Sequence, residues 1–125
     1  WKEEAPIIYG DGETSRDFCY VKNVVQINLL GALTENPQAL NKAYNVAVGE
    51  RTTLNQLFTL LRNQVIRFNP QAAAAEPEYQ DFRPGDIRHS LADISQARQL
   101  LGYEPQYDLP RGLEEAASWY AEHAV

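Results

Sequence analysis

The sequence of 125 residues contains one cysteine, Cys19, two histidines, His89 and His123, and no methionine. A single cysteine cannot form a disulfide within the chain, so the fold does not depend on one. The few cysteine and histidine residues form no group with the spacing of metal ligands, and we therefore expect no metal site. Cys19, flanked by Phe18 and Tyr20, is interpreted as a core residue.

Positive charge is also scarce. Eleven lysines and arginines stand against seventeen acidic residues, which gives a formal net charge of −6 at pH 7. Binding to the backbone of nucleic acid needs clustered lysine and arginine side chains, so nucleic acid is not expected as a partner. The sequence has no signal peptide and no long apolar run, and the chain is predicted to be soluble and cytoplasmic, with no insertion into a membrane. The few arginines of so acidic a chain are expected to act as local anchors.

The remaining composition is that of an ordinary globular domain. Hydrophobic residues make up 44% of the 125 residues, which is enough for the core of one domain. Apolar periodicity and turn residues predict a mixed α/β fold. Strands are expected at residues 6–8, 18–21, 43–48 and 78–82, and helices at 23–34, 54–65, 94–101 and from 109 onward. The helix at 23–34 is expected to have much of its surface covered, and 67–76 is expected to be an irregular connection.

Cap residues mark the ends of three of these helices. Thr53 and Gln56 have the spacing of a capping box. Asp93 is placed to cap the next helix, and Gly102 is placed to end it. Asp108 opens the last helix, which is expected to bury an apolar side made of Leu113, Ala116, Ala117 and Tyr120.

Three arginines occur in distinctive sequence settings. Arg16 lies in the stretch GDGETSRDF, Arg51 ends the stretch NVAVGER, and Arg83 begins the turn RPGD. A guanidinium is planar and permanently charged, and it binds two phosphate oxygens at once. A carboxylate such as that of Asp86 is a natural acceptor for the two hydroxyls of a ribose. Together these residues predict a site for a nucleotide sugar.

The same stretches resemble sequence blocks of the extended short-chain dehydrogenases/reductases that act on nucleotide sugars. The closest resemblance is to the UDP-N-acetylglucosamine 4-epimerases, with the blocks GDGxxxRDFxYVxN, YNVAVGxRT and RxGDxRHSxAD. Here these blocks occupy residues 10–23, 44–52 and 83–93. The resemblance is to the C-terminal, substrate-binding part of such an enzyme. It implies that residues 1–125 are a single segment of a Rossmann-type α/β fold, with short strands and about four helices.

The N-terminal half of such an enzyme is missing from this sequence. Neither the glycine-rich turn that would bind NAD nor the catalytic Tyr-x-x-x-Lys pair is present, because no tyrosine is followed by lysine four residues later. The chain also begins at Trp1 without an initiator methionine, which indicates an excerpt. We therefore expect a fragment that is inactive alone. Its partners would be a UDP-sugar and the missing NAD-binding half, within a homodimeric parent enzyme.

The resemblance also implies a role for each of five residues. Arg16, Arg51 and Arg83 would bind the substrate diphosphate, and Asp86 would bind the ribose. Ser90 occupies the position that limits space beside C2 of the sugar, where a small residue accompanies acceptance of an N-acetyl group and a tyrosine accompanies plain hexoses. The implied reaction is the NAD-dependent interconversion of UDP-N-acetylglucosamine and UDP-N-acetylgalactosamine at C4, in polysaccharide biosynthesis.

A purely structural role is the alternative for each charged residue. Arg16 would then be a solvated charge beside Asp17, and Arg51 a solvated charge at the start of a helix. Arg83 and Asp86 would form an ion pair within a surface turn.

Ser90 and His89 have alternatives too, and so does the chain as a whole. Ser90 could be a neutral bystander, and His89 a surface or partly packed residue. The chain could instead belong to a nucleotide-sugar dehydratase or decarboxylase, because the diphosphate site is shared among these enzymes. It could also be a free-standing nucleotide-binding or interaction module.

Overall fold

The computed structural model describes residues 5–123. Within this range the strands are β1 (Ile7–Tyr9), β2 (Ser15–Arg16), β3 (Thr52–Thr53) and β4 (Glu78–Gln80). The α-helices are α1 (Val21–Leu33), α2 (Leu54–Val65), α3 (Ser95–Leu101) and α4 (Leu109–His123), and two 3₁₀ helices are η1 (Pro37–Ala39) and η2 (Pro70–Ala74). The expected α/β fold with short strands and about four helices is confirmed.

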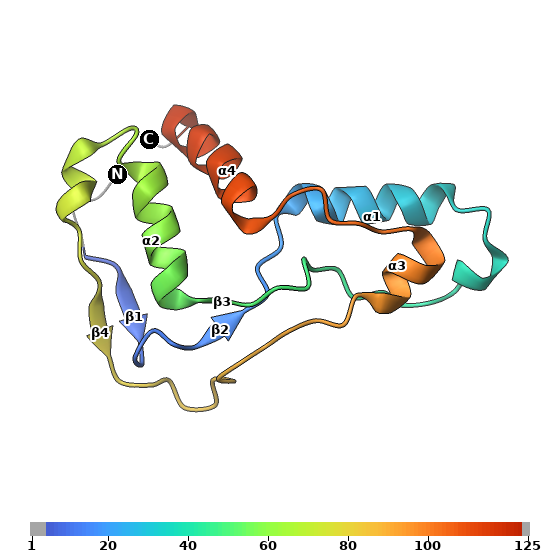
Figure 1. Ribbon diagram of the computed structural model, residues 1–125, viewed down its shortest axis with the longest axis horizontal. Helices are drawn as coiled ribbons and strands as arrows, with labels where there is room; N and C mark the ends of the chain where they lie inside the picture. Colours follow the sequence, from blue (N-terminus) through green and yellow to red (C-terminus); the bar gives the residue numbers. More distant parts are fainter. Residues whose placement is uncertain (1–4, 124–125) are drawn as a thin grey trace.

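The elements form two halves joined through β2 and β3 (Figure 1). In one half α1 packs with α3, and in the other α2 packs with α4 beside the pair β1 and β4. Strand β1 pairs with β4 in parallel, and β2 pairs with β3 in antiparallel orientation. Each pair joins an early segment of the chain to a much later one, so strand pairing sets the relative positions of the three sequence blocks.

A hydrophobic core lies between α1, η1 and α3. Its buried members are Ile27, Ala39, Ala47, Ile94, Ala97, Leu101 and Tyr103. The Tyr103 side chain is fully buried, and its hydroxyl donates a hydrogen bond of 2.9 Å to the carbonyl oxygen of Ala47. This bond gives the phenol a partner inside the core, where an unpaired hydroxyl would be costly.

Burial raises the pKa of Tyr103 to about 12. In the unfolded chain this phenol ionises near its ordinary pKa of about 10. Between pH 10 and 12 the unfolded state therefore loses its proton first, and stability falls with rising pH by at most about 1.4 kcal/mol per pH unit. We expect urea unfolding at pH 9 to 12 to show this loss, and we expect it to be smaller in Tyr103→Phe. Equal slopes for the two proteins would contradict the assignment.

The predicted helix ends are largely confirmed. Thr53 and Gln56 form both hydrogen bonds of a capping box at the start of α2. Gly102 ends α3 in the left-handed conformation, with φ of +64°. At the start of α4 the Asp108 carboxylate accepts the N–H of Arg111 at 2.9 Å.

The start of α3 differs from the prediction by one residue. Ile94 occupies the N-cap position, one residue after Asp93. The Asp93 carboxylate nevertheless accepts the N–H of Ser95, the first residue of α3, at 2.9 Å. Hydrogen bonds from Ser95 hold the pKa of Asp93 below its usual value. Asp93 therefore does stabilise the helix start, from outside the N-cap position.

Two predicted strands are not observed. Residues 18–20 lead directly into α1, which begins at Val21 because Asn23 already bonds back to the Tyr20 carbonyl. Residues 43–48 have no strand beside them in the described part of the chain. Their backbone groups are instead bound by side chains, as in the bond from Tyr103 to Ala47. The apolar composition of 43–48 indicates burial, but a strand also needs a neighbour.

The predicted burial of two helices is wrong in part. Along α1 only Asn23 and Ile27 are buried, whereas a stripe of apolar side chains is exposed. The stripe comprises Val21, Val25, Leu29 and Leu33, which recur at four-residue spacing along one side of the helix. On α4, Tyr120 is 58% exposed, and Gly112 and Ala117 are the buried residues. The periodicity identified the helices correctly but not what covers them.

Candidate functional site

Strand β2 is the centre of the candidate site. On one side Arg16 pairs with Thr52 of β3, and on the other Ser15 forms a parallel bridge with His89. The Ser15 N–H donates to the carbonyl of Arg88 at 2.9 Å, and the Ser15 carbonyl accepts the N–H of Ser90 at 3.1 Å. Three segments that are far apart in the sequence therefore meet at two residues.

This pairing brings together three of the five predicted site residues. Arg16 is partly buried in β2 and pairs with Thr52, the residue that follows Arg51. The N–H of Ser90 is hydrogen-bonded to Ser15, the residue before Arg16. The Arg16 guanidinium donates to the carbonyl of Ser15 at 2.9 Å, which leaves most of its donors for other acceptors.

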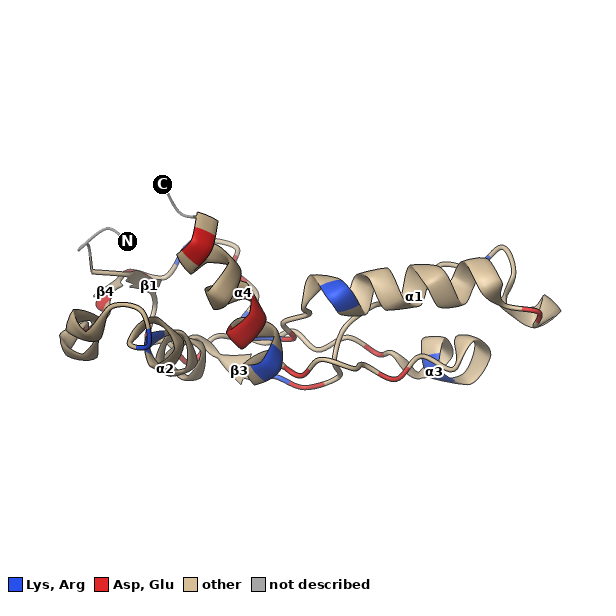
Figure 2. Cartoon of the chain, turned by 90° about the horizontal axis from the view of Figure 1, so that it is seen from above, with Lys and Arg blue, Asp and Glu red and all other residues tan. Residues whose placement is uncertain are grey.

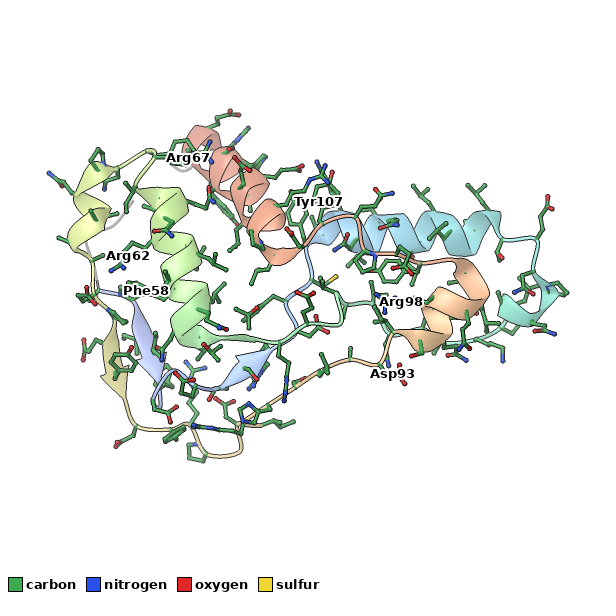
Figure 3. The ribbon with its side chains drawn as sticks, viewed as in Figure 1. Phe58, Arg62, Arg67, Asp93, Arg98 and Tyr107 are labelled. Carbon is green, nitrogen blue, oxygen red and sulfur yellow. The ribbon has the colours of Figure 1, made fainter. Side chains whose placement is uncertain are left out.

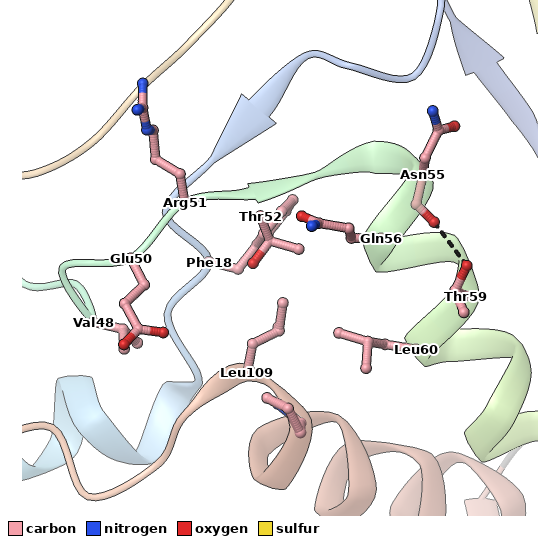
Figure 4. Close-up of a pocket in the computed structure, with 11 residues that line it drawn as sticks. Phe18, Val48, Glu50, Arg51, Thr52, Asn55, Gln56, Thr59, Leu60 and Leu109 are labelled. Carbon is pink, nitrogen blue, oxygen red and sulfur yellow. Dashed lines mark hydrogen bonds between the residues drawn. The ribbon is translucent and has the colours of Figure 1, made fainter.

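Arg51 lies on the rim of a cavity of about 590 Å³ between the start of α2 and the start of α4 (Figure 4). Phe18, Leu60 and Leu109 line its interior, with Gln56 and Thr59 beside them. The Arg51 side chain points away from the cavity and out of the rim. Arg51 is therefore available to a ligand outside this cavity.

Arg83 and Asp86 belong to a separate exposed turn. The Asp86 N–H donates to the Arg83 carbonyl at 3.2 Å, and Gly85 has φ of +85°, a conformation that favours glycine. The Arg83 guanidinium lies 3.7 Å from the ring centroid of Tyr9, as a cation–π contact. No ion pair joins Arg83 to Asp86 within residues 5–123. The structure therefore places this turn beside β1 and does not bring it into contact with Arg16 or Arg51.

The arginines of this chain fall into two groups. Four of them form ion pairs with carboxylates: Arg62 with Glu76, Arg67 with Glu114, Arg88 with Asp11, and Arg98 with Glu104. Figure 3 labels Arg62, Arg67 and Arg98, and Figure 2 shows acidic residues spread over both halves. Arg16, Arg51, Arg83 and Arg111 form no ion pair within the described residues. The arginines singled out from the sequence are thus among those without a carboxylate partner.

His89 packs against β2. Its Nδ1 lies 2.8 Å from the Ser15 hydroxyl, and Ser15 is 4% exposed. All three polar groups of Ser15 are consequently bound to residues 88–90. His89 is exposed, which agrees with the surface role considered for it. Ser15 is the residue that attaches the segment carrying Ser90.

Sequence reasoning missed two residues that organise the site. Asp17 accepts hydrogen bonds from Val48 and Gly49, and Asn23 is fully buried with bonds to Gln106 and Tyr107. Both belong to the first sequence block, of which Asn23 is the final residue. Their position in that block was the sequence signal that could have identified them. Their hydrogen-bond partners are too distant in sequence to be predicted from the block.

The described residues offer little for metal binding or acid–base chemistry. No group of three or more histidine, cysteine, aspartate or glutamate residues is suitably placed for a metal within residues 5–123. Burial raises the pKa of the Cys19 thiol, which disfavours the reactive thiolate. In the described part of the chain no helix is long and apolar enough to cross a membrane.

The family model described as GDP-mannose 4,6 dehydratase matches residues 2–116. This chain belongs to that family. The match to nearly the whole chain also confirms the resemblance to the C-terminal part of the extended short-chain dehydrogenases/reductases. The chain spans about a third of the length of the curated relatives that it matches.

Three relatives show the range of proteins that this member of the GDP-mannose 4,6 dehydratase family resembles. It is 31% identical to UDP-glucose 4-epimerase of Mycolicibacterium smegmatis, over 90% of this chain and 33% of that protein. UDP-N-acetylglucosamine 4-epimerase from Methanobrevibacter ruminantium, in complex with UDP-N-acetylmuramic acid, is 38% identical with a TM-score of 0.80, over 95% and 35% of the two chains. UDP-glucuronic acid 4-epimerase from Bacillus cereus, in complex with UDP-glucuronic acid and NAD, is 25% identical with a TM-score of 0.75, over 96% and 36%.

Proposed function

We propose that this chain is the substrate-binding part of a UDP-sugar 4-epimerase that interconverts UDP-N-acetylglucosamine and UDP-N-acetylgalactosamine. The observation that carries the proposal is the lack of a carboxylate partner for Arg16, Arg51 and Arg83 within the described residues. In a chain with a net charge of −6, such arginines keep their donors for an anionic ligand. The similarity to solved UDP-sugar 4-epimerases supports the same class of ligand.

Each of the five residues has a proposed role. Arg16 and Arg51 bind the diphosphate at β2, and Arg83 binds it from the exposed turn. Asp86 accepts the ribose hydroxyls. Ser90 is attached to β2 through Ser15, so a sugar beside it would extend from a diphosphate held at Arg16. The small Ser90 side chain leaves room for an N-acetyl group, which is the reason for preferring N-acetylated sugars.

NAD is assigned to the rest of the parent protein. In a dinucleotide-binding fold the glycine-rich turn leads from a strand into a helix N-terminus. Here the turn containing Gly10 and Gly12 leads from β1 to β2, so it does not fit a dinucleotide pyrophosphate. The described residues thus provide binding and orientation of the sugar nucleotide, and the chain alone is proposed to be inactive.

The exposed stripe of α1 is the proposed contact with that remaining part. Val21, Leu29 and Leu33 are 61%, 58% and 78% exposed, which is unusual for apolar side chains aligned on one helix. The chain spans about a third of the length of its relatives. The remaining two thirds of a parent protein of that length would be large enough to cover this surface. We propose that the parent is a cytoplasmic homodimer.

Calorimetric titration of this chain with UDP, UDP-glucose and UDP-N-acetylglucosamine tests the proposal. We expect saturable binding of all three, and we expect the N-acetylated sugar to bind at least as tightly as UDP-glucose. The double variant Arg83→Ala, Asp86→Ala removes one charge-assisted contact to phosphate and one to ribose, and should weaken binding at least about tenfold. Arg67→Ala, which removes an arginine already paired with Glu114, is the matched control.

The same titration, extended to GDP-mannose, distinguishes a second candidate. The family model is that of GDP-mannose 4,6 dehydratase, so a dehydratase acting on a guanine nucleotide sugar is the nearest rival. Tighter binding of GDP-mannose than of any UDP-sugar would favour the dehydratase. Absence of binding by a chain with cooperative unfolding would contradict the proposal that this part binds the ligand unaided.

A further inference from the structure

The carboxylate of Asp17 binds two successive backbone amides. Its Oδ1 accepts the N–H of Val48 at 3.0 Å, and its Oδ2 accepts the N–H of Gly49 at 3.0 Å. The carboxylate and the amides are about thirty positions apart in the sequence. Both oxygens of one side chain are therefore occupied by the segment that leads to Arg51.

Gly49, the second of these two residues, occupies a position that favours glycine. Gly49 has φ of +86°, which an L-residue with a side chain rarely adopts. A Cβ on Gly49 would also lie 3.3 Å from Cδ1 of the buried Ile94. Gly49 is therefore confined between Ile94 and the Asp17 carboxylate.

Other contacts hold the residues that precede Val48, because Ala47 is buried in the core and its carbonyl accepts the Tyr103 hydroxyl. Residues 43–48 have no strand neighbour in the described part of the chain. Beyond Arg51, Thr52 pairs with Arg16 in the β2–β3 ladder. The turn that carries Arg51 is thus held at one end by Asp17 and at the other by its neighbour Arg16.

We propose that Asp17 is the positioning residue for Arg51, an inference that rests on the proposed function of Arg51 in binding the diphosphate. Asp17 fixes the backbone amides of Val48 and Gly49, shortly before Arg51, and so places Arg51 next to Arg16. Both oxygens of the Asp17 carboxylate accept these N–H groups. Asp17 forms no ion pair with Arg16 within residues 5–123. This explains why an acidic residue can stand next to an arginine that is proposed to bind phosphate. Its carboxylate is hydrogen-bonded to backbone amides and not to the guanidinium.

The variant Asp17→Asn tests the proposal with little change in shape. One side of the asparagine amide still accepts an N–H, but its NH₂ group faces the second N–H as another donor. We expect amide hydrogen exchange of Val48 and Gly49, measured by NMR, to become at least about tenfold faster. Affinity for UDP should fall about tenfold in the otherwise wild-type chain, but less than about twofold in the Arg51→Ala background.

Two results would overturn the proposal. The first is an equal loss of UDP affinity from Asp17→Asn in both backgrounds, because Asp17 would then act independently of Arg51. The second is unchanged amide exchange at Val48 and Gly49. If a folded wild-type chain binds no UDP, the proposed function fails, and the amide exchange alone decides whether Asp17 fixes this segment. Asp108→Asn, at a helix start where asparagine also caps well, is the control for removal of one negative charge.

Discussion

Replacing Asn23 by alanine is expected to destabilise the fold by about 2 to 4 kcal/mol, the largest loss expected for a single polar side chain of this protein. Asn23 has no exposed surface. Its Nδ2 donates to the Tyr107 carbonyl at 2.7 Å, and its Oδ1 accepts the N–H groups of Gln106 and Tyr107 at 3.1 and 3.0 Å. The alanine variant leaves all three backbone groups without this partner, in a place where the amide itself was fully enclosed.

The experiment is urea unfolding followed by circular dichroism, with Asn28→Ala as the matched control. Asn28 lies on the same helix, but it is exposed and its side chain donates only to the Val24 carbonyl within that helix. We expect the control to change stability by less than about 0.5 kcal/mol. Similar losses in the two variants would mean that the bonds to residues 106 and 107 do not hold α1 to the segment before α4.

Replacing Arg16 by alanine is expected to lower the affinity for UDP about 10- to 100-fold. Charge-assisted hydrogen bonds contribute about 1.5–3 kcal/mol each, and a tenfold change in affinity corresponds to about 1.4 kcal/mol. Arg16 occupies the strand on which the other two segments converge, and its described contact is a single bond to the Ser15 carbonyl. Most of its donors are therefore available to a diphosphate.

Calorimetry with UDP measures this loss, and thermal unfolding shows whether the variant remains folded. Arg98→Ala is the control, because Arg98 pairs with Glu104 at α3, away from β2. We expect the control to bind UDP within about twofold of the wild-type chain. Equal binding by Arg16→Ala and the wild-type chain would remove Arg16 from the site and leave it as a solvated charge.

The local features of this fold could be predicted from the sequence alone. The capping box of Thr53 and Gln56, the left-handed Gly102 and the turn at residues 83–86 all appear where the residues indicated. The four helices and the α/β class follow from the same kind of signal. Each of these depends on residues within a few positions of one another, whose conformational preferences persist in any tertiary context.

Only the tertiary structure decided which segments meet and what each side chain contacts. Residues 43–48 have the composition of a buried strand, yet side chains bind their backbone. The sequence placed Asp17 beside Arg16, but its carboxylate bonds to Val48 and Gly49. A strand partner, a buried hydrogen bond and the covering of a helix face are contacts between distant parts of the chain. Their energies depend on the neighbour as much as on the residue, so no local pattern determines them.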